Sequence, residues 1–174
     1  DIPRAAAVLA DAFESDPVWG AVLGDATPEQ RAAAFETPVR YGMRYGEAYA
    51  PSAALEGVAV WVPGALADMT FWRVFRSGAM WAGMKLGFGI TKKMLPVFQP
   101  IEVDRRDHMR GKSYIYLLVI GVAPQFQRQG FASKLVRALI EQSEQAEVPI
   151  YLETETESNV RMYEHLGFAV VREI

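Results

Sequence analysis

The chain has 174 residues, of which 51% are hydrophobic and 22% are charged, and its net charge is −3. This length and balance are typical of one globular domain with a substantial core. An acidic net charge gives no electrostatic basis for binding nucleic acid, so we expect no nucleic-acid partner. Cysteine is absent, which excludes disulfides, thiolate metal ligands and a cysteine nucleophile, and is consistent with a cytoplasmic protein.

The first third of the chain predicts two helices. Residues 1–14 place apolar side chains on one helical face, and the pair Asp16-Pro17 ends that helix. The run Thr27-Pro28-Glu29-Gln30 is a capping box, which predicts a second helix that continues to Tyr45. Residues 47–49 and 57–62 then predict a strand hairpin.

Residues 65–112 are predicted to be a helical insertion after this hairpin. The helical part covers 68–95 and breaks near Gly78 or Gly83. Residues 104–108, which include His108, have the composition of a solvated loop. Basic side chains interrupt the apolar part too often for a transmembrane helix, and we expect no membrane partner; these are Arg73, Arg76, Lys85, Lys92 and Lys93.

The last third of the chain predicts alternating strands and helices. Residues 113–122 form a continuous apolar strand of the kind buried on both faces, and residues 130–145 have the spacing of an amphipathic helix. A short strand over 150–154 follows. A helix capped by Ser158 then ends at Gly167, and residues 168–174 are expected to form a last strand.

The most informative motif lies where the apolar strand meets the next helix, and it reads Gln127-Arg128-Gln129-Gly130-Phe131-Ala132. The first N–H groups of a helix have no intrahelical partner and lie at the positive end of its dipole, so they can bind a phosphate group. Gly130 and Ala132 leave that backbone accessible. A dinucleotide site is the alternative, but Gly-x-Gly-x-x-Gly is absent.

A second block, Asn159-Val160-Arg161-Met162-Tyr163 followed by Glu164-His165-Leu166-Gly167-Phe168, comes roughly thirty residues later. The two blocks in this order resemble the acyl-coenzyme A signature of the GNAT superfamily of N-acetyltransferases, over about residues 113–174. The resemblance implies one α/β (α+β) domain over 1–174. Its mixed, mostly antiparallel sheet is flanked by helices and has a splayed central parallel strand pair that ends near Val122 and Thr154. Family members usually have one further antiparallel strand.

The resemblance implies acetyl-CoA as the cofactor, held in the cleft between the splayed strands. A backbone N–H near Ile120–Val122 would polarise the thioester carbonyl. Asn159 would bind the pantetheine arm or a phosphate, or would instead be a second helix cap beside Ser158. The expected cofactor-binding residues are Ile120, Val122, Gln127, Arg128, Gln129, Gly130, Phe131, Ala132, Ser133 and Asn159.

Two residues are the catalytic candidates. In the family, the tyrosine that matches Tyr163 often protonates the leaving thiolate, which an ordinary phenol can do at neutral pH; the alternative is a helix-face aromatic in the core. Glu153, or Glu155 just beyond it, is the candidate general base, and the alternative is a pair of solvated acids. His165 is expected at the surface. No His, Asp or Glu cluster has metal-ligand spacing, so no metal is expected.

These patterns predict direct acetyl transfer to an amine. Similarity to bacterial small-molecule N-acetyltransferases favours a small acceptor; transfer to a protein lysine or N-terminus and a non-catalytic acyl-CoA sensor are the alternatives. The insertion would then be an acceptor-pocket wall or the interface of a homodimer. Its aromatic and Met side chains are predicted to share one helix face: Trp72, Phe75, Met80, Trp81 and Met84.

Overall fold

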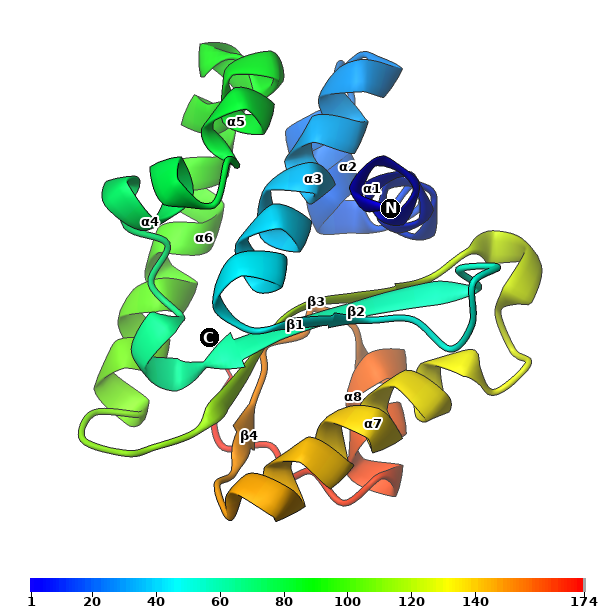
Figure 1. The fold of residues 1–174 in the computed structure, drawn as a ribbon, viewed down its shortest axis with the longest axis vertical. Coiled ribbons are helices and arrows are strands. Elements are labelled where there is room, and N and C mark those ends of the chain that lie inside the picture. Colours follow the sequence, from blue (N-terminus) through cyan, green and yellow to red (C-terminus); the bar gives the residue numbers. More distant parts are fainter. Residues whose placement is uncertain (174) are drawn as a thin grey trace.

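The computed structural model describes residues 1–173 and contains a four-stranded sheet in the order β1-β2-β3-β4 (Figure 1). The strands β1, β2 and β3 pair antiparallel, whereas β3 and β4 pair parallel. This arrangement confirms the mixed α/β sheet expected from the sequence. The strands are β1 (Glu47–Tyr49), β2 (Gly57–Pro63), β3 (Ile115–Val122) and β4 (Ile150–Tyr151).

The parallel pair separates after two residues. Ile115 faces Ile150 and Tyr116 faces Tyr151, after which β4 ends while β3 continues to Val122. The register between β2 and β3 shifts because β3 has an extra residue at Leu118. Such a bulge bends its strand, so the geometry supports the predicted splay. The predicted strand 150–154 is longer than the observed β4, which ends at Tyr151. The middle of β3 is only half-buried, because β4 does not continue beside it.

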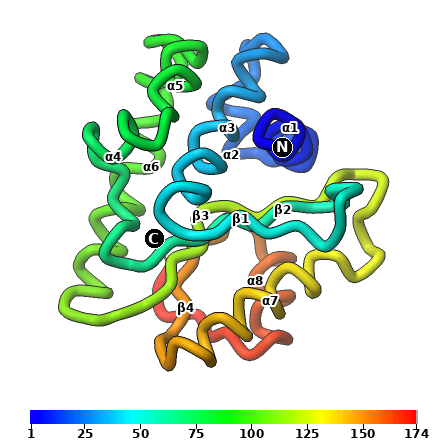
Figure 2. The backbone as a smooth tube through the Cα atoms, in the orientation of Figure 1, coloured from blue at the N-terminus to red at the C-terminus, as the bar shows by residue number. Residues whose placement is uncertain are grey.

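Helices cover both faces of this sheet (Figures 1 and 2). The helices α1 (Ile2–Ala12), α2 (Pro17–Leu23) and α3 (Pro28–Tyr45) lie on one face. The helices α7 (Phe131–Ala146) and α8 (Glu157–His165) lie on the other face, where Leu135, Val136 and Leu139 are completely buried. Two short 3₁₀ turns, Gly64–Leu66 and Pro124–Phe126, follow β2 and β3.

Local sequence explains the helix boundaries of the N-terminal layer. The capping box is present, with Thr27 and Gln30 side chains each bonded to the other's backbone N–H. Asp16-Pro17 does end the first helix, but it also begins α2, which the sequence reading missed. The Asp16 carboxylate accepts hydrogen bonds from the N–H groups of Val18 and Trp19, and Pro17 is at the first helical position, where it suits the backbone.

The insertion forms three helices: α4 (Phe71–Arg76), α5 (Met80–Leu86) and α6 (Phe88–His108). The break near Gly78 is confirmed, since Gly78 has φ +75°. A second break falls at Gly87, with φ +82°, rather than at Gly83. The solvated loop predicted for 104–108 is wrong, because these residues are the last turn of α6 and Arg105 within them is 2% exposed.

The C-terminal segment differs from the prediction in two ways. Thr156 rather than Ser158 caps α8, accepting a hydrogen bond from the Asn159 N–H. Residues 168–173 form no strand and do not join the sheet; the last residue of the predicted strand, 174, is outside the described residues. The segment is held by the Phe168 ring against Tyr163 at 5.4 Å, and by an ion pair between Arg172 and Asp104 at 2.7 Å.

Candidate functional site

The loop between β3 and α7 presents the start of a helix without a side-chain cap. Gly130 has φ +82° and occupies the N-cap position, where no side chain bonds the first N–H groups. The helical hydrogen bonds begin with Lys134 N–H to Gly130 C=O. Arg128 also has a positive φ, +60°, a conformation that is uncommon for a non-glycine residue and concentrates at functional sites. The arrangement can bind an anionic group.

A Cβ atom built at Gly130 would meet no heavy atom within 4 Å, so a pyrophosphate can approach the backbone there. The Gln127 backbone N–H, which was predicted to help bind the cofactor, is used within the loop. Its N–H already donates to the Pro124 carbonyl at 3.3 Å, and its side-chain amide donates to the Val122 carbonyl at 3.2 Å. Gln127 therefore ties the loop to the end of β3. The open backbone is therefore at Gly130, at the uncapped start of α7.

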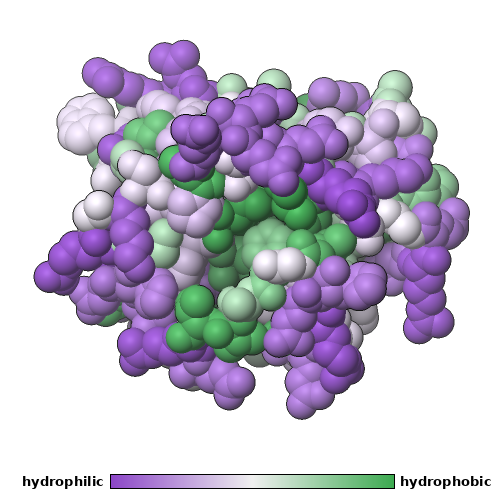
Figure 3. All heavy atoms as spheres, turned by 90° about the horizontal axis from the view of Figure 1, so that it is seen from below, coloured by the Kyte–Doolittle hydropathy of each residue, from purple (hydrophilic) through white to green (hydrophobic). Residues whose placement is uncertain are grey.

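Beyond the splay, the edge of β3 that faces away from β2 has backbone groups without a partner strand, although the Val122 carbonyl accepts the Gln127 side-chain amide. The Ala123 N–H donates to Glu56 on the β2 side at 2.9 Å. Because backbone groups alternate along a strand, those of Ile120 and Val122 face the opposite side, where β4 has already ended. Seen from the side of α7 and α8, the molecule has an apolar hollow surrounded by hydrophilic side chains (Figure 3). An extended pantetheine arm could pair with this edge.

Tyr163 lies on α8 and is 6% exposed. Burial, and secondarily the charge of Glu155, raise the pKa of its hydroxyl, so the phenol stays protonated and can donate a proton. Asn159 lies one helical turn earlier on the same face. It is not a cap, since Thr156 occupies that position and bonds the Asn159 N–H, and so its side-chain amide is not committed to capping.

Glu153 is the second residue after β4, at the point where the strands have separated. Its carboxylate oxygen Oε1 is buried without a hydrogen-bond partner. Burial raises the pKa of Glu153 to about 7, and the neighbouring Tyr116 hydroxyl and Arg105 guanidinium limit the rise. A carboxylate with this pKa can accept a proton near neutral pH. Burial also raises the pKa of Glu155, but its side chain is exposed.

Arg105 is the residue that sequence reasoning missed. It reaches from α6 to the sheet, where its guanidinium carbon Cζ lies 4.4 Å from the centre of the Tyr116 ring and its Nη2 donates to Asp68 at 2.8 Å. Its Nε is buried without a partner. Four charged side chains in the five residues 104–108 suggested solvent exposure. The burial of Arg105 could have been recognised only if the predicted helix had been extended through this run, which places Arg105 on its inner face.

Two cavities lie near the insertion. One, of about 370 Å³, is lined by residues of the β2 end, α6 and the start of β3, including Asp68 and Tyr114, and so adjoins the Arg105 contact. The other, of about 250 Å³, lies between α2, α3 and the α5–α6 junction. Neither is lined by the predicted aromatic face. Trp72, Phe75, Trp81 and Met84 are 55–71% exposed and come from two helices, whereas Met80 is half-buried.

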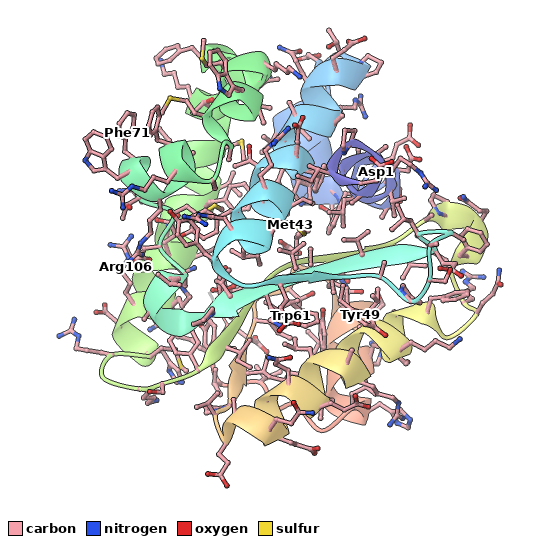
Figure 4. The ribbon with its side chains drawn as sticks, in the orientation of Figure 1. Asp1, Met43, Tyr49, Trp61, Phe71 and Arg106 are labelled. Atoms are coloured by element: carbon pink, nitrogen blue, oxygen red, sulfur yellow. The ribbon has the colours of Figure 1, made fainter. Side chains whose placement is uncertain are left out.

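Other groups within residues 1–173 bear on metal, membrane and proton chemistry. No set of three or more His, Asp or Glu side chains is arranged to hold a metal ion. In this part of the chain, no helix is both long enough and apolar enough to cross a bilayer. His165 is exposed, as expected. His108 is not in a loop; its ring lies 6.0 Å from that of Tyr151. The Trp61 Nε1 is buried without a partner, beside Tyr49 (Figure 4).

Comparison with known proteins agrees with this geometry. The family model "Acetyltransferase (GNAT) family" matches residues 86–168. An uncharacterised N-acetyltransferase of Schizosaccharomyces pombe is 31% identical over 183 aligned positions, which cover the whole of this chain and 73% of the relative. A solved structure described as an acetyltransferase aligns with a TM-score of 0.53 and 16% identity, covering 98% of this chain and 87% of the other, which supports the fold alone.

The chain therefore belongs to the GNAT family of acetyltransferases. Members of this family are enzymes that use acetyl-CoA as the acetyl donor, and the uncapped α7 N-terminus and the open backbone at Gly130 fit that co-substrate.

Proposed function

We propose that the protein transfers the acetyl group of acetyl-CoA to a small primary amine, with Glu153 as the general base. The observation that carries this proposal is the position of Glu153 at the separation of β3 and β4, with a buried, unpartnered carboxylate oxygen and a pKa of about 7. A base poised at neutrality in the cleft expected to hold the thioester is what amine acetylation requires.

The need for a base follows from the acceptor. An amine with the pKa of a lysine, about 10.4, has fewer than about one molecule in a thousand in the neutral form at pH 7. Glu153 Oε1 takes the proton from the ammonium group, directly or through one water molecule, and leaves the lone pair free to attack. Holding the amine beside the acetyl carbonyl in one cleft adds the advantage of proximity.

The remaining roles belong to β3, α7 and α8. Acetyl-CoA supplies the activated acetyl group as a thioester. The N–H groups of residues 128–133 bind its pyrophosphate, the β3 edge at Ile120 and Val122 orients its arm, and Asn159 bonds it from α8. Tyr163 donates its hydroxyl proton to the departing thiolate, and its raised pKa keeps that proton available.

The size of the acceptor is inferred from the cavity next to Asp68 and Tyr114. Its volume of about 370 Å³ is in the range of small-molecule sites, and it adjoins the Arg105 contact that faces Glu153. A protein substrate would need an open groove that admits an extended chain. We therefore favour a small amine over a protein lysine or N-terminus.

The experiment is a thiol-release assay with acetyl-CoA and panels of small amines, peptides with a free N-terminus and lysine peptides. Because the protein contains no cysteine, a thiol-reactive dye reports only the coenzyme A that is released. Turnover with small amines and none with peptides is expected. Turnover with peptides alone would replace the small acceptor by a protein; tight acetyl-CoA binding without turnover on any panel would indicate a sensor.

A further inference from the structure

The insertion carries a solvent-exposed aromatic surface that the catalytic proposal does not use. Six large apolar side chains on α4, α5 and the start of α6 are between 55% and 84% exposed. Phe71, Trp72 and Phe75 contact one another edge to face, at ring distances of 5.5 and 6.2 Å. We call this set the aromatic surface; it consists of Phe71, Trp72, Phe75, Trp81, Met84 and Phe88.

The aromatic surface faces away from the sheet. Phe71 lies on the outer side of α4, on the opposite side from the sheet and from α3 (Figure 4). Neither cavity is lined by any of the six residues. An exposed apolar set of this kind, spread over the consecutive helices α4 and α5 and the start of α6, is typical of an interaction site.

The segment that carries this surface has charged side chains of one sign only, although Lys93 within it pairs with Asp25 at 3.2 Å. Residues 69–101 contain five basic residues and no Asp or Glu, in a chain whose net charge is −3. Among residues 1–173, the side chains of Arg76, Lys85 and Lys92 form no ion pair and are exposed. Exposed tryptophans flanked by unpaired basic side chains are typical of segments that lie in the headgroup region of an anionic bilayer.

A second copy of the chain fits this surface less well. In a two-fold symmetric dimer the same patch faces itself, so the basic side chains of one copy would meet those of the other, and the segment has no carboxylate to pair with them. An anionic lipid surface offers the complementary charge over the whole patch.

We propose that the aromatic surface binds the protein peripherally to an anionic membrane surface, with Trp72 and Trp81 inserted among the headgroups and Arg76, Lys85 and Lys92 facing lipid phosphates. This orientation places the rest of the chain, which is acidic as a whole, away from the bilayer. It leaves the cleft at Glu153 independent of the membrane, so the inference stands whether or not the acceptor is a small amine.

The test is sedimentation of the full chain with vesicles of phosphatidylcholine alone or mixed with phosphatidylserine, together with tryptophan emission. Trp72 and Trp81 are the exposed tryptophans, whereas Trp61 is 3% exposed and Trp19 is half-buried, so insertion should shift the emission to shorter wavelength. We expect binding to the mixed vesicles, weakening as salt is raised, and little binding to phosphatidylcholine alone.

Two variants and two matched controls separate the contributions. Trp72→Ser with Trp81→Ser should reduce vesicle binding at least about tenfold, whereas Met43→Ser with Val171→Ser removes equally exposed apolar side chains elsewhere and should have no effect. Neutralising the three basic side chains of the surface to Gln should remove the preference for phosphatidylserine. Neutralising the same number of exposed arginines elsewhere should not; these are Arg44, Arg137 and Arg161.

Absence of wild-type binding to mixed vesicles at low ionic strength would overturn the proposal, as would equal binding to uncharged vesicles. A dimer in sedimentation velocity that becomes a monomer in the double Trp variant would assign the surface to a subunit interface instead.

Discussion

The Arg105 guanidinium lies over the ring of Tyr116, with 4.4 Å between Cζ and the ring centre, and pairs with Asp68 on its other side. This contact joins the insertion helix α6 to β3 at Tyr116, the last β3 residue that pairs with β4. Tyr116 and Arg105 both face Glu153 and lower its pKa, against burial and the Glu155 carboxylate, which raise it. Burial raises the pKa of Tyr114 and of Tyr151, and the charge of Glu153 adds to the rise in each.

The first prediction concerns Arg105. Replacing it by Gln removes a positive charge that favours ionised Glu153, so the pKa of Glu153 should rise by about one unit. The acid limb of the kcat–pH profile should move to higher pH by the same amount. Arg105→Lys keeps the charge and should keep the limb near its wild-type position, although both variants lose about 1–3 kcal/mol of stability through the disturbed pair with Asp68. If the acid limb lies at the same pH in the wild type and both variants, Arg105 does not influence the pKa of Glu153.

The second prediction concerns Glu153 itself. With a pKa of about 7, the wild-type kcat should rise with pH through a midpoint near 7, because only the ionised carboxylate accepts a proton. Glu153→Gln should lower kcat by about 10²–10⁴ and abolish this limb. A variant that keeps both full turnover and the limb would move the base elsewhere, and Glu155→Gln is then the matched test.

The same substitution has an expected effect on stability. The folded-state pKa lies above the ordinary 4.5, so the folded protein binds the extra proton and wild-type stability should fall as pH rises from about 4.5 to 7. At about 1.4 kcal/mol per unit, and with part of the side chain exposed, Glu153→Gln should gain about 2–3 kcal/mol over wild type at pH 8 and little at pH 4. Urea unfolding at both pH values measures the difference. If the difference in unfolding free energy between the variant and the wild type is the same at both pH values, Glu153 is solvated.

Much of this fold could be predicted because local signals agreed with it. The Thr27 capping box, the hairpin that ends at Pro63 and the glycine-led turn into α7 each depend on neighbours in the sequence. What failed depends on distant partners. Arg105 is buried because its guanidinium pairs with Asp68 and lies over the Tyr116 ring. Neither partner is close to Arg105 in the sequence, so the charged run 104–108 does not reveal them. The segment 168–173 has strand-forming residues but does not join the sheet.

The candidate site divides in the same way. Gly130 was selected from a motif at one helix start and Tyr163 from the family resemblance, and the roles of both stay predictions. The environment of Glu153 was not predictable, since its raised pKa comes from burial beneath side chains of α6 and β3. The predicted aromatic face failed as a single face because Gly78 turns the chain between Trp72 and Trp81.

The third prediction concerns the general acid. Tyr163→Phe keeps the packing against Phe168 and removes only the hydroxyl. We expect kcat to fall by about 10²–10⁴ with acetyl-CoA affinity nearly unchanged, measured by calorimetry. Tyr45→Phe is the control, since it removes a hydroxyl from a ring on α3 that packs against Tyr41 and has no role in the candidate site. Full turnover of the Tyr163 variant, under conditions in which chemistry limits the rate, would leave Tyr163 with a packing role only.

The last prediction concerns cofactor binding at Gly130. Gly130→Glu places a carboxylate where the N–H groups of α7 are expected to hold the pyrophosphate, so the Kd for acetyl-CoA should rise about 10²–10³-fold. The side chain has open space, and the positive φ adds a strain of about 1–2 kcal/mol. Gly111→Glu is the matched control, since Gly111 also has a positive φ, +73°, and open space around its Cβ. Both variants should lose similar thermal stability, and only Gly130→Glu should lose acetyl-CoA binding in calorimetry. If the two bind acetyl-CoA equally well, the pyrophosphate site is not at the start of α7.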